Sequence, residues 1–584
     1  MKFLKALSKK ENFWPLLLVM IAGILASRTL IFQKGYFNMH DDLQMMRQLQ
    51  MEKCFLDLQI PCRWVPDMGY GFGFPLFNFY PPLPYLIGEL FRLIGLSFVV
   101  TAKLTFALSF IVSGVGMYYL AKEFFGRVGG IVSAIFYVWA PYHAVDVYVR
   151  GAMNESWGLV FFPFIFYFGY KLISEKKNIN KWLIGLMLAY FGLFTSHNLM
   201  ILIFTPVFIF WSLMWMKLKN SWNRIPHLAL AGIGSLGLSA YFTIPAIAEN
   251  KLTWLKSQLI GYYDYTAHFV TLKQLLISRF WDYGPSVWLE YDRMSFQAGH
   301  VHWLLSLVIF ALVLAAILKN RKKGKKLKID SAYLIIIFLF VIGWIAAFMT
   351  HVRSTPIYQA IPILALVQFS WRFLTLVTFA FSFMAGAVVL FINKLGNKYL
   401  ILITSALTVG LIIFNWNYFL PEHGKMGKLT DQDKFSAAAW DLQQTAGIYD
   451  YLPGTAKEAP KGPQKVLAEI MAGGGNAAKR QDQVSKMEQG TDWARFSVNS
   501  DKPLKIRIGI FQFPNWEVTV DDKKIETFMP VEERWGRMWI EVPEGEHVVV
   551  AEFKDTPIRT FSNILSLLSW LGLVGYLIAI KKKK

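Results

Sequence analysis

The sequence predicts an all-α polytopic membrane bundle of about twelve transmembrane helices, with an α+β domain containing a β-sandwich inserted before the last helix. Of the 584 residues, 55% are hydrophobic and 16% aromatic, whereas soluble globular chains are roughly 45–50% apolar. Charged residues make up only 17% and lie between apolar runs such as 14–32 and 331–349, each about as long as a bilayer crossing requires. A polar stretch with strand-like patterns precedes the last apolar run. This composition excludes a disordered chain and an ordinary soluble enzyme.

The net charge of +21 reflects membrane topology. The short loops at residues 1–13, 122–128, 171–181, 217–225, 319–328, 393–398 and 581–584 carry 26 of the 60 basic residues but only 3 of the 39 acidic residues. By the positive-inside rule these loops are cytoplasmic, in a cell membrane protein whose two termini both lie inside. The number of crossings is then even, and no nucleic-acid partner is expected.

Each predicted crossing is an apolar run bounded by charged or polar residues. The first run has no small-residue cleavage site, so it is a retained helix and not a signal peptide. The run at 84–96 is short and carries Glu89 and Arg92, so we expect an amphipathic helix on the outer membrane surface. The twelve crossings are 14–32, 98–120, 128–143, 154–172, 182–195, 198–216, 226–247, 301–318, 331–349, 372–392, 399–416 and 561–580.

This topology divides the chain into a transmembrane domain (1–416, including an external loop at 33–97), an extracytoplasmic domain (417–560), and a last helix with its basic tail (561–584). Within the external domain, residues 421–490 are helical and loop-rich, with a helix at 433–445. Residues 491–556 show short strand patterns separated by turn signals such as Asp521-Asp522, typical of a β-sandwich. The predicted strands are 494–498, 504–510, 516–520, 537–542 and 547–553.

Both cysteines, Cys54 and Cys62, lie in the first external loop. A disulfide survives in that compartment. Two unpaired thiols are an equal alternative, because the sequence does not give the distance between the Cα atoms.

Directly after the first crossing come His40, Asp41 and Asp42. Adjacent carboxylates are often only a solvated loop or a helix cap. Beside a membrane they could also hold a divalent cation such as Mg²⁺ or Mn²⁺, or one could accept a proton from an incoming hydroxyl. The same loop continues with an aromatic run that includes Tyr70, Phe72, Phe74 and Tyr80, too many rings to leave in water. We expect this run to fold back onto the protein or the lipid interface.

Three further polar patches lie where helices emerge on the external side, at 142–155, 196–198 and 368–372. Taken alone, each patch could consist of polar side chains at helix ends that extend to the membrane–water interface. Together with residues 40–42, however, they favour one shared external cavity containing Glu155 and His197. Arg150 and Arg372 suit a phosphate, because the guanidinium fork matches phosphate oxygens. The sequence contains no Walker loop, HExxH, paired CxxC or dinucleotide fingerprint.

Five motifs carry a resemblance to known proteins. They are His40-Asp41-Asp42, Pro61-x-Arg63-Trp64, the run 69–83, Tyr148-x-Arg150-Gly151-Ala152-x-x-Glu155 and Gln368-Phe369-x-Trp371-Arg372. Together they resemble the bacterial membrane proteins known as 6-pyruvoyl-tetrahydropterin synthase-related, over most of the membrane part. The acidic first loop, its aromatic Pro-Pro-Leu segment and the turn at 121–126 are similar to the GT-C superfamily of polyprenyl-phosphate-dependent glycosyltransferases. Residues 513–547, with Phe513-Pro514-x-Trp516, Asp521-Asp522 and Pro543-x-Gly545-x-His547, are similar to the external β-domain of YfhO-like proteins.

The resemblance implies transfer of a sugar from a polyprenyl-phosphate donor to a hydroxyl of a glycan, lipid or protein acceptor at the outer membrane face. Asp41 or Asp42 would be the base, and His40 with the second aspartate would orient the acceptor or an optional metal ion. Phosphate and substrate would meet Arg63, Arg150, Glu155, His197 and Arg372. The rings of Tyr70, Phe72, Phe74 and Tyr80 would shape the entrance for sugar and lipid.

Two other functions fit parts of the pattern. A lipid-linked saccharide transporter should carry ionisable residues near helix midpoints, whereas here Lys103 is the clearest such charge. A non-catalytic scaffold displaying the β-domain during envelope assembly would not need the acidic and aromatic loop.

Overall fold

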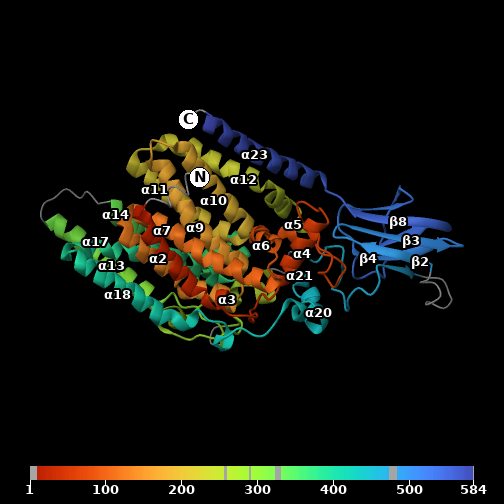
Figure 1. Ribbon diagram of the computed structural model, residues 1–584, viewed down its shortest axis with the longest axis horizontal. Coiled ribbons are helices and arrows are strands. Elements are labelled where there is room, and N and C mark those ends of the chain that lie inside the picture. Colours follow the sequence, from red (N-terminus) through yellow and green to blue (C-terminus); the bar gives the residue numbers. More distant parts are fainter. Residues whose placement is uncertain (1–9, 255–258, 289–290, 323–330, 472–482, 583–584) are drawn as a thin grey trace. The chain divides into compact units, whose positions relative to one another are not determined.

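The computed structural model describes residues 10–254, 259–288, 291–322, 331–471 and 483–582 (Figure 1). Parts of three predicted basic stretches, residues 1–9, 323–330 and 583–584, lie outside the described residues. Contacts divide the chain into two compact units. The first comprises Met1–Gln44, Val99–Ser235 and Gly261–Leu429, and the second comprises Met45–Phe98, Leu236–Ile260 and Thr430–Lys584.

Helices dominate the first unit. Among them α16 is buried at every residue, as expected of a helix that is apolar on all sides, and it packs against α13 and α14. Its helices are α2 (Lys10–Ala26), α3 (Arg28–Phe32), α7 (Phe98–Val138), α8 (Pro141–Ala144), α9 (Met153–Ser174), α10 (Ile179–Ser196), α11 (Asn198–Lys219), α12 (Ile225–Ala248, which continues into the second unit), α13 (His300–Lys322), α14 (Ser331–Met349), α15 (Thr355–Ala360), α16 (Leu374–Ala385), α17 (Val389–Ile392) and α18 (Asn397–Asn415).

Ten helices of the described chain are long and apolar enough to cross a membrane, so the protein is a multi-pass membrane protein. Two of the twelve predicted crossings, 98–120 and 128–143, begin in the single 41-residue helix α7. Gly126 separates them, because its backbone (φ 69°, ψ −176°) is not helical. The first predicted crossing contains only a shorter apolar helix, Asn12–Ala26.

The second unit combines helices with two antiparallel sheets, whose strands are drawn in blue in Figure 1. One sheet has the strand order β1-β4-β7 and the other β2-β3-β8-β5-β6. The helices are α4 (Gln44–Leu56), α5 (Leu76–Phe79), α6 (Leu83–Leu93), α19 (Asp431–Lys434), α20 (Ala437–Thr445), α21 (Ile448–Tyr451) and α23 (Pro557–Lys582). The strands are β1 (Ala468–Met471), β2 (Val484–Gln489), β3 (Trp493–Ser500), β4 (Leu504–Phe511), β5 (Trp516–Val520), β6 (Lys523–Ile525), β7 (Arg537–Val542) and β8 (Gly545–Phe553).

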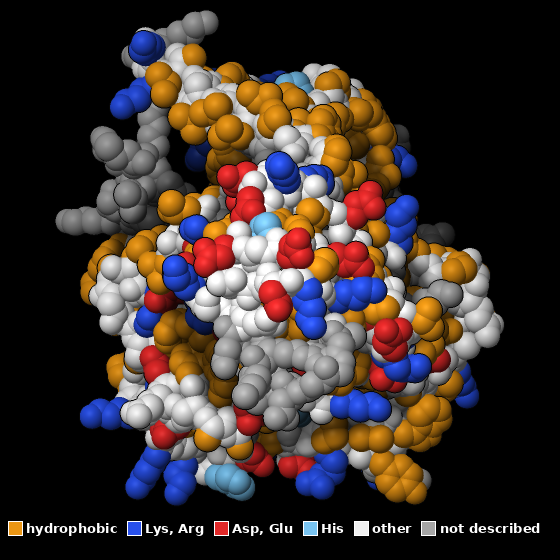
Figure 2. Space-filling model, turned by 90° about the vertical axis from the view of Figure 1, so that its right-hand side faces the viewer, with side chains coloured by type: hydrophobic (Ala, Val, Ile, Leu, Met, Phe, Trp, Pro, Cys, Tyr) orange, Lys and Arg blue, Asp and Glu red, His pale blue; other side chains and the backbone are white. Residues whose placement is uncertain are grey.

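All five predicted strands are present, as β3, β4, β5, β7 and β8. Strand β3 alternates buried and more exposed residues along its length and pairs with β8 from Trp493↔Glu552 to Ser500↔Gly545. The turn signal at Asp521-Asp522 is the β5–β6 hairpin, where both residues have positive φ (46° and 64°). That conformation is typical of a type I′ turn. Acidic and basic side chains are interspersed on the face shown in Figure 2.

Two local predictions need correction or completion. The single helix predicted at 433–445 is two helices, α19 and α20, because Ser436 has extended backbone (φ −139°, ψ 158°) as the N-cap of α20. The two cysteines, for which two states were open, form the disulfide Cys54–Cys62. The predicted amphipathic segment contains helix α6, with Glu89 buried and Leu90 and Leu93 exposed, and its position at a membrane surface stays a prediction.

Candidate functional site

The candidate site lies in the first unit, where the chain turns between α7 and α9. After α7 comes α8, then a short π-helical segment, η1 (Val145–Val149), and Gly151 before α9 begins at Met153. Tyr142, Asp146 and Arg150 are spaced four residues apart along this turn, a spacing that places side chains on one face of a helix.

Ion pairs connect these residues with α9, with the 3₁₀ segment η11 (Ser370–Phe373) that precedes α16, and with the α10–α11 junction. Arg150 pairs with Asp146, and its Nη1 lies 2.9 Å from Oε2 of Glu155. The same oxygen lies 3.4 Å from Nε of Arg372 and 3.9 Å from Nε2 of His197. The Tyr142 hydroxyl donates to the other Glu155 oxygen at 2.7 Å. Glu155 is therefore the centre of a cluster that we call the Glu155 cluster: Tyr142, Asp146, Arg150, Glu155, His197 and Arg372.

The cluster is almost closed to solvent. Asp146 is 0% exposed and Glu155 1%, whereas Arg150 and Arg372 each keep 8% of their surface accessible. Burial, together with the neighbouring Glu155 charge, raises the pKa of Asp146 well above its usual range. The cluster therefore gathers two guanidinium groups and two carboxyl groups in one nearly closed space.

His197 adds a neutral ring to this arrangement. Burial, reinforced by the two nearby arginines, lowers the pKa of His197 to about 3, although Glu155 opposes the shift. Its Nδ1 accepts the backbone N–H of Leu199 at 3.2 Å, so in the neutral ring Nε2 carries the proton. That N–H is the atom nearest Glu155.

Stacked aromatic rings support both arginines. The guanidinium of Arg150 lies 4.5 Å from the ring centre of Trp371, and that of Arg372 lies 4.7 Å from the ring centre of Phe369. The two rings stack on each other at 4.8 Å. Trp371 donates its indole N–H to Ser286 at 3.1 Å, and the same hydroxyl contacts Nδ1 of His268 at 2.8 Å. The rings thus hold the guanidinium groups in place through cation–π contacts.

The predicted His40-Asp41 element lies directly beside Arg150. The backbone N–H of His40 donates to Val149 at 3.1 Å, and that of Asp41 donates to Arg150 at 2.9 Å. Gly151 permits this approach: it has φ +61°, and a Cβ there would lie 2.2 Å from Sδ of Met39.

The side chain of Gln44 also stabilises the contact between Asp41 and the backbone around Gly151. Its amide donates to a carboxylate oxygen of Asp41 at 3.0 Å and to the carbonyl of Gly151 at 2.8 Å. Asp42, the next residue along the chain, is half-buried. The structure therefore brings together His40, Asp41, Arg150, Glu155, His197 and Arg372, and their roles stay predictions.

Arg63 belongs to a different cluster, in the second unit. Its guanidinium donates to Asn78 at 3.0 Å, to Asn563 at 2.7 Å and to the carbonyl of Tyr241 at 3.0 Å. Glu249 accepts from Asn78 and from Arg559, both at 2.9 Å. The side chains of Arg63 and Arg559 are 4% and 0% exposed. These contacts join the first loop to α23 and leave Arg63 buried among polar partners.

The aromatic run packs a core in the second unit. Phe72, 3% exposed, contacts Phe511 and Trp535, and Phe74, 1% exposed, contacts Tyr451. These two rings pack a protein core in this structure instead of lining an opening, because aromatic side chains from the later domain cover them. Tyr70 and Tyr80 are half-buried. The run folds back onto the protein, one of the two outcomes expected.

Metal ligation at Asp41 and Asp42 has limited support from the side chains around them. Across the described ranges, no group of three or more His, Cys, Asp or Glu side chains is arranged to hold a metal ion.

One family of known proteins matches part of the chain. Residues 80–255 match the family described as dolichyl-phosphate-mannose-protein mannosyltransferase. The match covers less than half of the sequence. It includes Tyr142, Asp146, Arg150, Glu155 and His197, whereas residues 40–42 and Arg372 lie outside it.

Relatives are distant and only partly covered. An uncharacterized protein of Lactococcus lactis subsp. cremoris (strain MG1363) is 22% identical over 256 residues, which is 42% of this chain and 41% of that protein. The chain thus spans well under two thirds of that relative.

Three solved structures show weak similarity. The arabinofuranosyltransferase AftD from mycobacteria has a TM-score of 0.40 and 13% identity, over 70% of this chain and 27% of that chain. ArnT from Cupriavidus metallidurans, bound to undecaprenyl phosphate, has a TM-score of 0.36 and 14% identity, over 70% and 71%. The oligosaccharyltransferase AglB from Archaeoglobus fulgidus has a TM-score of 0.40 and 12% identity, over 73% and 57%. Scores this low do not establish a common fold.

Some members of the site were not singled out from the sequence. Asp146 precedes Arg150 by four residues within a patch already recognised as polar, so this spacing was an available signal. His268 and Ser286, which position Trp371, carry no motif that would have marked them.

Proposed function

We propose that this protein is an integral membrane glycosyltransferase that moves a sugar from a polyprenyl-phosphate donor to an acceptor hydroxyl. The observation that carries the proposal is the Glu155 cluster, where Arg150 and Arg372 lie within ion-pair distance of one carboxylate, beside the acidic His40-Asp41-Asp42 element. The family match at residues 80–255 supports the same reaction class, because its description names a transferase with a lipid-phosphate sugar donor.

The chemistry assigned to these residues is a single displacement. Asp41 or Asp42 accepts the proton of the acceptor hydroxyl, and the oxygen of that hydroxyl attacks the anomeric carbon. The bond from this carbon to the phosphate oxygen breaks, and the electron pair leaves with the lipid phosphate. A single displacement of this kind inverts the configuration at the anomeric carbon.

The arginines act on the leaving group. Arg150 and Arg372 are oriented by their aromatic supports before substrate arrives, so counter-charge for the departing phosphate is preorganised. Each arginine keeps a small accessible edge, and the remaining guanidinium N–H groups of that edge are suited to phosphate oxygens. No step in this scheme is assigned to a metal ion.

The acceptor class stays open among glycan, lipid and protein, and the reaction is placed at the outer membrane face by the positive-inside rule. Transport of a lipid-linked saccharide has no separate support, because Lys103, the clearest intramembrane charge, donates to the carbonyls of Gln33 (2.6 Å) and Gly35 (2.9 Å).

Substitution of the proposed base tests the assignment. Asp41→Asn and Asp42→Asn keep the side-chain size and remove proton acceptance, so at least one should abolish glycan or glycolipid output while protein levels in the membrane stay normal. Asp441→Asn, at an exposed position on α20, is the matched control. Unchanged output from both Asp41→Asn and Asp42→Asn would defeat the assignment.

A further inference from the structure

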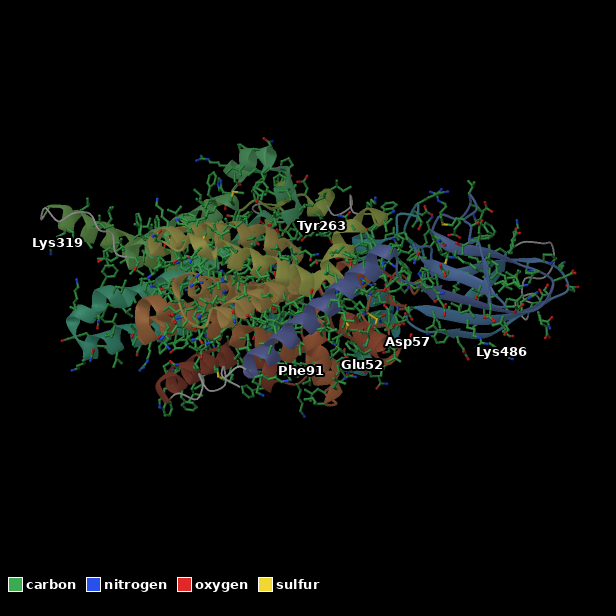
Figure 3. The ribbon with its side chains drawn as sticks, turned by 90° about the horizontal axis from the view of Figure 1, so that it is seen from above. Glu52, Asp57, Phe91, Tyr263, Lys319 and Lys486 are labelled. Atoms are coloured by element: carbon green, nitrogen blue, oxygen red, sulfur yellow. A yellow bond between two sulfur atoms is a disulfide. The ribbon has the colours of Figure 1, made fainter. Side chains whose placement is uncertain are left out.

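A hollow lies entirely within the second unit, which contains none of the Glu155 cluster. It has a volume of about 410 Å³ and is open on one side, a size typical of sites for small molecules. Five separate stretches of the chain form its wall: the end of α4, the loop at 66–71, the end of α20, Gln464 and the turn at 489–491. In Figure 3, Asp57 marks the place where the end of α4 meets the strand domain.

Hydrogen bonds fix this wall in position. The carboxylate of Asp57 accepts from the hydroxyl of Thr491 at 2.8 Å, from the backbone N–H of Thr491, and from the indole of Trp493 at 3.1 Å. Asp67 accepts from Gln50 and from Lys53, both at 2.6 Å. The carboxylates that face the hollow are therefore oriented without any ligand.

A glycine allows the loop backbone to form part of the wall. Gly71 has φ +79°, and a Cβ there would lie 3.3 Å from Cβ of Gln464 and 3.5 Å from Nε2 of Gln444. The preceding residue, Tyr70, contacts both glutamines through its backbone: its N–H donates to the carbonyl of Gln444 at 3.0 Å, and its carbonyl accepts from the N–H of Gln464 at 2.8 Å. These contacts hold two glutamine side chains against the hollow.

The side chains indicate what the hollow can bind. One ammonium (Lys53) and two carboxylates (Asp57, Asp67) give a net charge of −1, which disfavours phosphate. Three amides, from Gln444, Gln464 and Gln489, can both donate and accept hydrogen bonds. Closely spaced hydroxyl groups, which also donate and accept, are the matching ligand chemistry.

We propose that this hollow is a binding site for a neutral saccharide, about one or two sugar units in size and distinct from the Glu155 cluster. The carboxylates and amides bind the ring hydroxyls, and Leu56 and Pro66 supply the apolar part of the wall. The site extends the proposed function, because it would hold a glycan in a part of the protein to which no chemistry is assigned.

The test measures sugar binding to the full-length protein in lipid nanodiscs, free of sugar-based detergent. Saturation-transfer NMR with maltose, cellobiose, mannobiose and diacetylchitobiose should show transfer to at least one of them. The double variant Gln444→Leu with Gln489→Leu should reduce that transfer at least fivefold. Gln359→Leu, an exposed amide in the first unit, should not.

Three results would overturn the proposal: no transfer to any of the four sugars, transfer unaffected by the double variant, or stronger binding of glucose 1-phosphate than of the neutral sugars. The variants of the proposed base separate this site from the proposed reaction. Whichever of Asp41→Asn and Asp42→Asn loses transferase output should keep sugar binding, so failure of one proposal does not decide the other.

Discussion

Two clusters of buried charged side chains differ in how their arginines are held. In the Glu155 cluster the arginines keep an accessible edge and stack on Trp371 and Phe369, an arrangement that leaves them able to meet an anion. Around Glu249, in contrast, Arg559 is fully buried and every carboxylate oxygen is hydrogen-bonded. The second arrangement is structural.

Glu249 therefore offers a prediction about stability. Glu249→Gln leaves the buried guanidinium of Arg559 without its counter-charge, and breaking such a pair costs about 3 kcal/mol or more. We expect the midpoint of thermal unfolding of the purified protein to fall by several degrees. Glu526→Gln, at an exposed position, should leave it unchanged, and equal midpoints for the two variants would contradict the structural role.

Some contacts of individual residues could be predicted from the sequence, and others could not. The gathering of Arg150, Glu155, His197 and Arg372 was predictable, because polar residues at helix ends on one side of a bundle tend to share a cavity. The burial of Phe72 and Phe74 was not, since their partners Phe511, Trp535 and Tyr451 are hundreds of residues away in the chain. Arg63 was predicted to meet phosphate for the same reason, because its partners Tyr241 and Asn563 also lie far away in the chain.

At the scale of elements, the strands that could be recognised from the sequence are those with a clear apolar pattern. Strands β3, β4, β5, β7 and β8 carry apolar residues in their buried positions and were found from the sequence. Strand β2 was missed because it is an edge strand with four exposed polar side chains, and β1 and β6 are only four and three residues long. Helices were clear because each crossing is a long apolar run.

The turn that follows β2 carries a pH-dependent prediction. Burial, with the nearby charge of Asp57, raises the pKa of Asp492 to about 6. A raised carboxylate pKa means that the folded state binds more protons than the unfolded state between about pH 4 and pH 6, so the stability contributed by this group falls as pH rises through that range.

Asp492→Asn removes the ionisation and should raise the unfolding midpoint at pH 7.5. The gain should shrink toward zero at the lowest pH that the protein tolerates. Because Asp492 is only half-buried, solvent screening keeps the effect below its full linkage value. Thermal unfolding at several pH values would measure it, and a gain that does not depend on pH would disprove the stated cause.

At the scale of the whole molecule, charge asymmetry predicts orientation. By the positive-inside rule we expect residues such as Lys398 inside the cell and the domain with Asp441 outside. We expect a membrane-impermeant maleimide to label Asp441→Cys in intact cells and to label Lys398→Cys only after permeabilisation. Both positions are exposed, and the wild-type protein, whose two cysteines form a disulfide, provides the background. The opposite labelling pattern would place the candidate base on the wrong side for an external reaction.

The central claim is that the Glu155 cluster stabilises the phosphate that leaves a lipid-linked sugar. The most direct measurement is release of free polyprenyl phosphate from radiolabelled polyprenyl-phosphate sugars, mannose included, by the purified full-length protein in nanodiscs, with a membrane extract of the source cells added to supply the acceptor hydroxyl. Wild type and Arg353→Gln, an exposed control, should release it at equal rates. Arg372→Gln should be slower by roughly a hundredfold or more, as expected when one preorganised donor is removed, with unfolding midpoints recorded alongside. Equal rates for Arg372→Gln and wild type, or no release by wild type from any donor, would contradict the claim.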